Sequence, residues 1–305
     1  MFKNALLYTV KLPNVDTAAI ERALLETPFE ACGASQEVSS GWVPPRGEEH
    51  GALLEVVAGQ WIIKMMVETK KVPTQVLKRM VEEKVKAIEA STGRKPGKKE
   101  KREIADDAKL QLLPNAFATR GSVLMWIDPQ AGTLVLDAST QSKADQVMTM
   151  LVKAVDGIEV SLIGTQMSPS AAMAHWLVSK EPPQSFSVDR ECKLKAADES
   201  KALVKYGNHS LDIDEVSNHI AQGKVPMELA LTWNDRISLV LTASMSLKKI
   251  AFLDVVFDGK DQGGADFDGD VTISTGELKK MLPDLIDALG GRLDPGQPAD
   301  TSPSA

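Results

Sequence analysis

Residues 94–128 read RKPGKKEKREIADDAKLQLLPNAFATRGSVLMWID, and the rest of the chain is organised around this stretch. It opens with six cations in nine residues, in a protein whose formal net charge is −7. The six are Arg94, Lys95, Lys98, Lys99, Lys101 and Arg102. Cations concentrated on an acidic protein favour an anionic partner such as a polyphosphate, and the alternative is a solvated helix face.

Apolar residues at helical spacing predict one helix on each side of the first cations. The first helix is expected from Thr74, a predicted N-cap, to about Gly93, with an apolar stripe through residues 77, 81, 85 and 88. The second is expected to open within the cations and to end at Leu113, because Pro114 disfavours helical geometry in the residue before it. Together they predict a protruding helical hairpin with a cationic tip.

One large aromatic, Phe117, stands in the polar connection that follows the second helix. A phenylalanine in such a place either packs back onto its own domain or is presented to another chain as an apolar anchor. The sequence leaves both interpretations open.

The remaining pattern predicts an α+β fold with antiparallel sheets. Strands are expected at 2–12, 52–58, 60–69, 122–128, 133–138, 158–163, 185–188, 202–205, 227–233, 237–242 and 249–256. Helices are expected from Asp16 to before Pro28 and at 143–155, 169–179, 214–221 and 275–289, with a loop over 33–51. We predict a discontinuous central α+β domain (1–73 and 118–166), a helical arm or tip (74–117), a second α+β domain or base (167–292) and a disordered tail (293–305).

Composition places the chain among ordinary globular proteins. With 305 residues it can bury an ample core, and more than one subdomain is expected. Cys32 and Cys192 are widely separated, with no CxxC pair, which predicts reduced thiols and a cytoplasmic protein. No apolar run approaches the roughly 20 residues that span a bilayer, so no membrane partner is expected.

The two stretches that resemble known ligand-binding motifs, a phosphate loop and a calcium loop, each lack a required residue. Gly93 and Gly97 enclose three residues instead of the four of a phosphate loop, and Lys99 stands where Ser or Thr is needed. Residues 266, 268, 270 and 277 are acidic at positions 1, 3, 5 and 12 of a possible calcium loop, but Val271 replaces the glycine of position 6. We therefore favour a strand with acidic flanks, keep weak calcium binding open, and predict no catalytic residue, metal site or cofactor.

The composition also limits the mode of nucleic-acid binding. No zinc finger or zipper region is evident, and aromatic residues, which stack on single strands, make up only 5% of the chain. Phosphate contacts, which give affinity without sequence preference, remain. Other cations that can share such a surface are Lys143, Lys193, Lys195, Lys201, Lys205, Lys224, Lys248 and Lys249.

Several motifs, taken in order, resemble the RdgC family of recombination-associated proteins of proteobacteria. They are LLPNAF and MWID, the run 41–45 (GWVPP), the triplet 218–220 (NHI), and the ending 275–278 (TGEL) with 288–291 (ALGG). The likeness runs from about Phe2 to Gly291. It implies horseshoe-shaped subunits that close in pairs into a ring around duplex DNA, bind it with little sequence preference and restrain the recombinase RecA at the nucleoid.

The resemblance also implies roles for single residues. Phe117 matches the aromatic of a tip-to-tip gate, and Arg94 matches a basic residue of the DNA-lining surface or gate. Asn115 stands where well-known members carry an arginine, and Asn208 and His209 stand where the family has a Lys-Gln pair at the base interface. These departures put both dimer contacts in question, and Lys205 supplies some of the lost charge.

The leading hypothesis is a non-catalytic DNA-binding ring homodimer that modulates recombinase filaments. A rival from another class is an adaptor whose basic arm docks on an acidic protein such as RecA, with incidental DNA affinity. An enzymatic rival is a nuclease that holds magnesium on Asp266, Asp268 and Asp270.

Overall fold

The computed structural model describes residues 2–14, 16–257 and 266–293. The chain divides into two compact units, which are described separately here. Unit 1 comprises Met1–Ile20, Leu54–Ile63 and Leu124–Ala305, and unit 2 comprises Glu21–Leu53 and Lys64–Val123. The expected disorder of the tail concerns residues 294–305, which lie outside the described ranges.

Unit 1 is built on an antiparallel sheet, as the alternating sequence pattern predicts. Its strands run in the hydrogen-bonded order β6-β1-β12-β11-β10-β8-β9, while β7 pairs with β1 and β3 pairs with β4. The bounds are β1 Ala5–Lys11, β3 Leu54–Val57, β4 Gln60–Lys70, β6 Thr133–Leu136, β7 Glu159–Leu162, β8 Phe186–Ala196, β9 Leu203–Tyr206, β10 Lys224–Trp233, β11 Ile237–Thr242 and β12 Ser246–Phe252.

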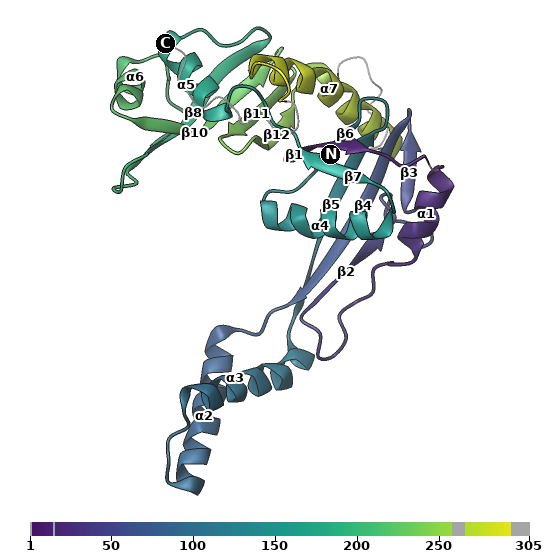
Figure 1. Ribbon diagram of the computed structural model, residues 1–305, viewed down its shortest axis with the longest axis vertical. Helices are drawn as coiled ribbons and strands as arrows, with labels where there is room; N and C mark the ends of the chain where they lie inside the picture. The colour runs from purple at the N-terminus through teal and green to yellow at the C-terminus, as the bar shows by residue number, and fades with distance from the viewer. Residues whose placement is uncertain (1, 15, 258–265, 294–305) are drawn as a thin grey trace. The chain divides into compact units, whose positions relative to one another are not determined.

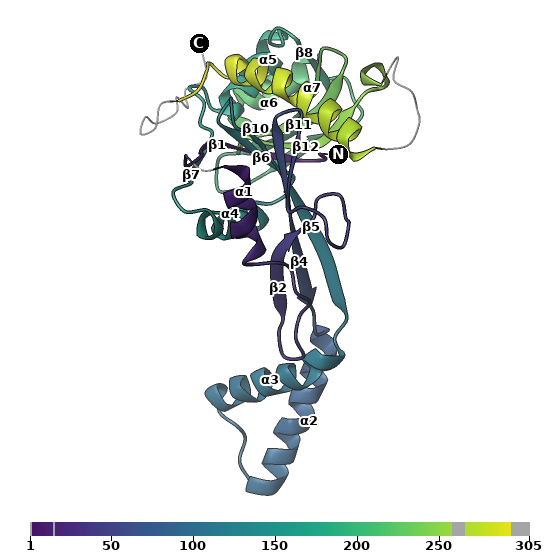
Figure 2. The ribbon, with the colours of Figure 1, turned by 90° about the vertical axis from the view of Figure 1, so that its right-hand side faces the viewer.

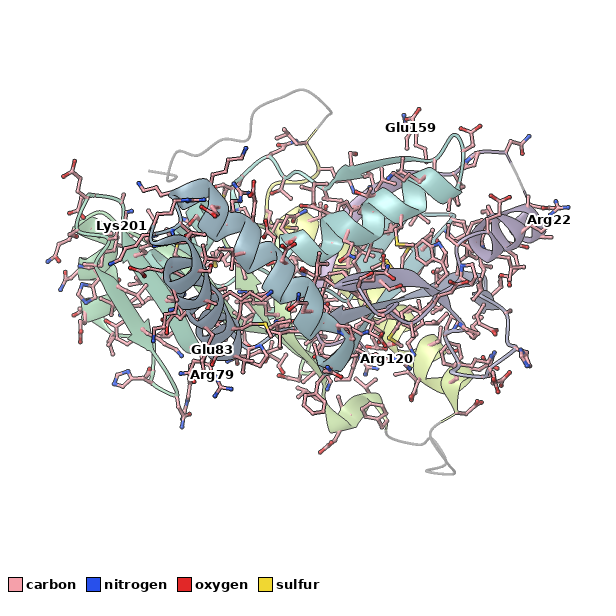
Figure 3. All side chains as sticks on the ribbon, turned by 90° about the horizontal axis from the view of Figure 1, so that it is seen from below. Arg22, Arg79, Glu83, Arg120, Glu159 and Lys201 are labelled. Carbon is pink, nitrogen blue, oxygen red and sulfur yellow. The ribbon has the colours of Figure 1, made fainter. Side chains whose placement is uncertain are left out.

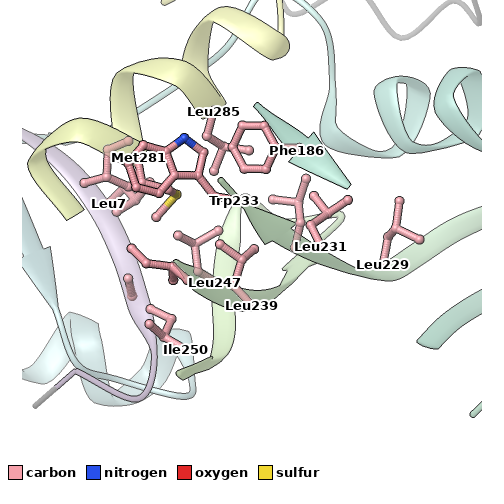
Figure 4. Packing of buried hydrophobic residues seen from close by; sticks show 14 of the residues in the cluster. Leu7, Phe186, Leu229, Leu231, Trp233, Leu239, Leu247, Ile250, Met281 and Leu285 are labelled. Carbon is pink, nitrogen blue, oxygen red and sulfur yellow. The ribbon is translucent and has the colours of Figure 1, made fainter. Parts of the chain in front are cut away.

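Helices cover one face of the strands β8 to β12. They are α5 Pro169–Ser179, α6 Asp214–Ala221 and α7 Phe267–Ala288 (Figure 1). Trp233 of β10 lies beside Met281 and Leu285 of α7 in the main core cluster, and Leu231 and Leu229 belong to the same cluster farther along β10 (Figure 4). A further helix, α4 Gln141–Ala154, begins at a Thr140 cap and buries its own apolar stripe, and a short 3-10 turn, η2, spans Asp254–Val256.

Polar contacts fix α7 on the sheet. Trp233 Nε1 donates to Asp284 Oδ2 at 2.8 Å, and the Arg236 guanidinium pairs with both oxygens of Glu277 at 2.6 and 2.9 Å. Because Trp233 and Arg236 flank the β10–β11 turn, the turn and the helix are held in one register.

Unit 2 carries the helical arm. It contains β2 Val38–Val43, paired with the second half of β4, and the first half of β5 Ala118–Asp128. The arm consists of α2 Thr74–Thr92, α3 Lys98–Leu112 and the 3-10 turn η1 Leu113–Asn115 (Figure 2). The end of α3 one residue before Leu113, and its continuation as a 3-10 turn through Pro114, follow the prediction closely.

Local packing explains why glycine occupies position 41 of the GWVPP run. A Cβ on Gly41 would lie 2.3 Å from the Phe29 Cα, so the two backbones approach too closely for any other residue. The neighbouring Trp42 is buried and exchanges backbone hydrogen bonds with Thr27 and Phe29.

The α+β class and the antiparallel sheet are confirmed, and α5, α6 and β11 have the predicted bounds. The helix α1 Thr17–Leu25 begins after Asp16, whose carboxylate accepts the Ala19 amide at 2.7 Å as a cap. The N-cap of α2 is Pro73, so the prediction of Thr74 as the cap is wrong by one residue.

Three predicted segments need larger corrections. The loop expected over 33–51 contains β2, and β8 extends to Ala196, eight residues beyond its expected end. The strand with acidic flanks, expected through the β-prone run 271–273, is part of α7, which begins at Phe267 and not at Thr275. β-prone Val271 is buried in the core cluster of unit 1, so tertiary packing outweighs its local preference. The Thr272 hydroxyl donates to the Asp268 carbonyl one turn back.

Candidate nucleic-acid interface

The six cations of residues 94–102, which we call the basic segment, occupy the loop between α2 and the start of α3. Gly93 ends α2 in the left-handed region at φ 72°, and its amide bonds the Glu89 carbonyl at 2.9 Å. Gly97 then precedes α3, whose first turn and a half carries Lys98, Lys99, Lys101 and Arg102. Gly93 ends α2 and the chain continues through the connection to α3, so the cations lie in this connection and in the first turns of α3 (Figure 2).

Two of the six cations are already engaged by carboxylates. Arg94 Nη1 and Nη2 lie 2.8 and 3.1 Å from the oxygens of Glu100, and this pairing lowers the pKa of Glu100. Lys95 Nζ lies 3.7 Å from Glu89.

The other four cations of the basic segment are exposed. Within residues 2–14, 16–257 and 266–293 no carboxylate forms an ion pair with Lys98, Lys99, Lys101 or Arg102. These four therefore supply the open positive charge of the basic segment.

The start of α3 adds to this field. Gly97 offers no side chain to cap the helix, and Glu100 is the only acidic residue in the first turn. A helix N-terminus is the positive end of the helix dipole, so four cations there repel it, and an anion that approached would relieve both. The sequence predicted both the cluster of cations and its place at a helix start, and α3 begins at Lys98 within that cluster.

Phe117 leaves the arm with its side chain 92% exposed, between η1 and β5. The interpretation that it packs back onto its own domain is therefore wrong. Asn115, at the end of η1, is also exposed, and the Ala116 amide closes the turn onto the Leu113 carbonyl at 3.1 Å. A rigid turn thus presents an aromatic ring to solvent, which is typical of a contact surface for another chain.

Lysines also gather on one side of the sheet in unit 1. Alternate residues of β8 face opposite sides, so Cys192 and Leu194 join the core and Lys193 and Lys195 point to the face without α5, α6 and α7. Two adjoining hollows of about 610 and 120 Å³ lie on this face. The cations that line them, which we call the lysine face, are Lys193, Lys195, Lys201, Lys205, Lys248 and Lys249.

The lysine face also contains two glutamates. Glu228 Oε1 lies 3.0 Å from Lys248 Nζ, and Glu191 Oε2 lies 2.5 Å from Lys249 Nζ. Sequence reasoning missed both glutamates. The repeat Glu191-x-Lys193-x-Lys195 would have indicated Glu191, had β8 been predicted at its full length.

Lys205, predicted as a DNA-binding residue, lies on the lysine face in β9. Asn208 and His209 follow β9 in a turn, with Asn208 at φ 53°. The His209 amide donates to the Arg190 carbonyl at 3.1 Å, and its Nδ1 lies 2.7 Å from the Ser210 carbonyl. Their side chains belong to unit 1, whereas the basic segment, Asn115 and Phe117 belong to unit 2.

The acidic residues of the possible calcium loop are placed on a helix. Asp266 precedes α7, Asp268 and Asp270 lie in its first turn, and Glu277 is taken up by Arg236. Among the described residues, no three His, Cys, Asp or Glu side chains are grouped so that they could hold a metal ion.

Cys32 and Cys192 are free thiols, and burial raises the pKa of Cys192 to about 12. In the part of the chain that the structure describes, no helix has the length and apolarity needed to cross a membrane.

Fold and surface together define a mixed α+β protein with two cationic surfaces, one on a helical arm and one on a sheet. The family model RdgC, described as "Putative exonuclease, RdgC", matches residues 1–292. The chain is 40% identical over 301 residues to the recombination-associated protein RdgC of Dechloromonas aromatica, covering 96% of this chain and 98% of that protein. It is 40% identical over 295 residues to the protein of the same name from Herminiimonas arsenicoxydans, covering 95% and 98%, and 37% identical over 295 residues to that of Bordetella pertussis, covering 95% and 98%. The chain belongs to the RdgC family.

Proposed function

We propose that this protein binds DNA without sequence preference, as a homodimeric ring around the duplex, and thereby restrains the activity of RecA filaments. The observation that carries the proposal is a group of four exposed cations at the start of α3 that have no carboxylate partner among the described residues: Lys98, Lys99, Lys101 and Arg102.

Phosphate contact is the mode that these side chains support. Lysine and arginine neutralise phosphates and release counterions, which gives affinity that depends on salt and not on sequence. The basic segment contains no aromatic residue, so base stacking makes no contribution there. The lysine face adds a second set of phosphate-binding side chains, to which Lys205 belongs.

Pairing of two copies would use the exposed aromatic. Phe117 offers an apolar ring on a rigid turn, and Asn115 beside it offers an amide where an arginine would add charge. In the proposed ring, two arms meet at Phe117, and two bases meet near Asn208 and His209. Arg94, which Glu100 holds, belongs to the DNA-lining surface or to the gate in this proposal. The horseshoe subunit, with its arm (74–117) and base (167–292), and the location at the nucleoid in the cytoplasm belong to the same proposal.

A ring makes a topological prediction that a surface patch does not. The purified protein is expected to be a dimer by analytical ultracentrifugation, and to stay on closed circular DNA while it slides off linear DNA with free ends. Equal retention on the two DNAs would contradict the ring. Dimer formation without DNA binding at low salt would contradict the DNA-binding function.

The second candidate function is a protein adaptor, and the exposure of Phe117, which lies in the same unit as the basic segment, favours it. In that case the arm docks on an acidic protein surface. The adaptor function predicts a tight complex with purified RecA in the absence of DNA, and only weak DNA binding that is lost as salt rises.

The DNA-binding experiment should include magnesium and record the length of the DNA afterwards, because the family description names an exonuclease. Shortened DNA would favour the nuclease.

A further inference from the structure

The lysine face is interrupted by two carboxylates at defined places. Glu228 of β10 stands opposite Lys193 of β8 in the strand register, and its Oε1 reaches Lys248 of β12 at 3.0 Å. Glu191 stands two residues before Lys193 on the same strand, and its Oε2 reaches Lys249 at 2.5 Å. Each carboxylate is therefore set among several lysines instead of beside a single partner.

The charges of the neighbouring lysines keep the Glu191 carboxylate ionised. The contact with Lys249, and to a smaller extent the charge of Lys205, lowers the pKa of Glu191, so this carboxylate stays ionised near neutral pH. With six lysines and two glutamates, the lysine face keeps a surplus of positive charge, but two of its lysines, Lys248 and Lys249, are occupied.

We infer that Glu191 and Glu228 are built-in competitors of nucleic-acid phosphates, which hold Lys248 and Lys249 and thereby limit how tightly the lysine face grips DNA. This inference rests on the proposed DNA-binding function. A phosphate that approaches Lys248 must first displace the Glu228 carboxylate, so each such contact exchanges one anion for another. A backbone held through exchangeable contacts can move along the surface, whereas free lysines would hold it in place.

The alternative, that the pairs serve only to stabilise the sheet, is weaker on physical grounds. The Glu191 and Lys249 side chains are 45% and 66% exposed, and ion pairs at such positions typically contribute little to folding. Glu228 and Lys248 are less exposed, at 32% and 38%, yet both still border a hollow open to solvent. Their geometry therefore points to an effect on what binds the face.

The test is DNA affinity of the full-length variants Glu228→Gln and Glu191→Gln, measured by fluorescence anisotropy on a labelled duplex across a salt series. Glutamine keeps the shape of the side chain and removes its charge. Each variant is expected to bind roughly 3- to 10-fold tighter than wild type at low salt, and the slope of log affinity against log salt should steepen by about 0.9 for each lysine released to a phosphate.

Glu159→Gln is the matched control. It removes the same charge and breaks a similar pair, Lys11–Glu159 at 2.9 Å, within the same unit but away from the lysine face. Figure 3 shows Glu159 and Lys201 far apart on the molecule. The control is expected to bind as wild type does.

Three results overturn the inference. Wild-type affinity in both Glu228→Gln and Glu191→Gln, with normal thermal unfolding, would show that the pairs do not compete with DNA, and would leave the proposed function standing. An equal gain in Glu159→Gln would show a general charge effect instead of local competition. Absence of DNA binding by wild type and all variants at low salt would overturn the inference together with the proposed function.

Discussion

Arg94 and Glu100 face each other across the turn of the helical arm, with two parallel contacts of 2.8 and 3.1 Å between guanidinium and carboxylate. The pair ties the loop after α2 to the first turn of α3. It also removes the Arg94 charge from the set that is free to meet an anion, although Arg94 is the first cation of the basic segment.

Removing a cation that is paired with a carboxylate is therefore expected to weaken DNA binding less than removing an unpaired cation of the arm. Arg94→Gln should weaken DNA binding less than Lys99→Gln, because Arg94 must leave Glu100 before it can contact a phosphate. Affinity measured by anisotropy at one salt concentration, with Lys78→Gln on α2 as a control outside the basic segment, would check this. A larger loss in Arg94→Gln would mean that Arg94 leaves Glu100 when DNA binds.

The same pair makes the arm sensitive to acid. Arg94 lowers the pKa of Glu100 below its ordinary value of 4.5. The stabilising contact is therefore complete above pH 4.5 and is lost as the pH falls through the lowered pKa. The protection factors of the amides at 94, 95 and 97–101, which are exchange rates corrected for their intrinsic pH dependence, should fall over that acid range in wild type. In Glu100→Gln the protection factors should already be lower at pH 7 and should change little with acid.

Phe117→Ala is expected to weaken dimer formation without lowering the stability of the fold. With 92% of its side chain exposed, removal of the ring should change the free energy of unfolding by less than about 0.5 kcal/mol, while dimer formation and retention on circular DNA should fall. Phe186→Ala is the contrasting change, since that ring is buried in the unit 1 core and its loss should cost about 3–5 kcal/mol. Unchanged dimerisation in Phe117→Ala would remove the gate assignment.

Lys279→Gln is expected to destabilise unit 1 at neutral pH. Lys279 Nζ lies 2.8 Å from Oδ2 of Asp128, whose side chain is 1% exposed. Burial opposes ionisation of Asp128, but Lys279 and the amides of residues 130 and 131 outweigh it, so its pKa falls below the ordinary value of 3.8.

The expected loss is about 1–3 kcal/mol, the cost of leaving a buried charged acceptor without its partner. Because the lowered pKa stabilises the fold above pH 3.8 and ceases to do so in acid, the gap between wild type and Lys279→Gln should be widest at pH 7 and should narrow below pH 3.8. Chemical denaturation of both proteins at several pH values measures this difference in the free energy of unfolding. Lys280→Gln, which removes a neighbouring exposed lysine, is the control and should change stability little.

Calcium is expected not to bind residues 266–277 at micromolar concentrations. Asp266, Asp268 and Asp270 are spread around the start of α7, and Glu277 is held by Arg236, so they do not converge as a loop would require. Calorimetric titration of calcium into metal-free protein should give only heats of dilution. A saturable heat would contradict this.

Periodicity was sufficient to predict the helical arm, the helices α5 and α6 and the antiparallel class, because their apolar residues recur at the spacing of one buried face. It failed at β8, where lysines and a glutamate alternate with core residues, so the strand looked polar beyond Val188. It failed again at α7, where β-branched residues hide a helix that tertiary packing maintains.

Of the two cationic surfaces, the sequence predicted the basic segment but not the lysine face. Clustering of cations along the chain indicated the basic segment, since its residues are neighbours in sequence. The lysine face joins β8, β9 and β12, which are brought together only by strand order, so no local pattern could reveal it. Nor could sequence show that Glu100 engages Arg94 or that Phe117 is exposed.

The most direct test of the account compares the salt dependence of DNA binding in wild type with that in a variant in which Lys98, Lys99, Lys101 and Arg102 are all changed to Gln. Each phosphate contact contributes about −0.9 to the slope of log affinity against log salt. The account predicts that the variant binds more weakly at low salt, with a slope shallower by up to about 3.6, the sum for four lost contacts. Identical slopes and affinities in the two proteins would contradict the claim that these four cations hold the DNA backbone.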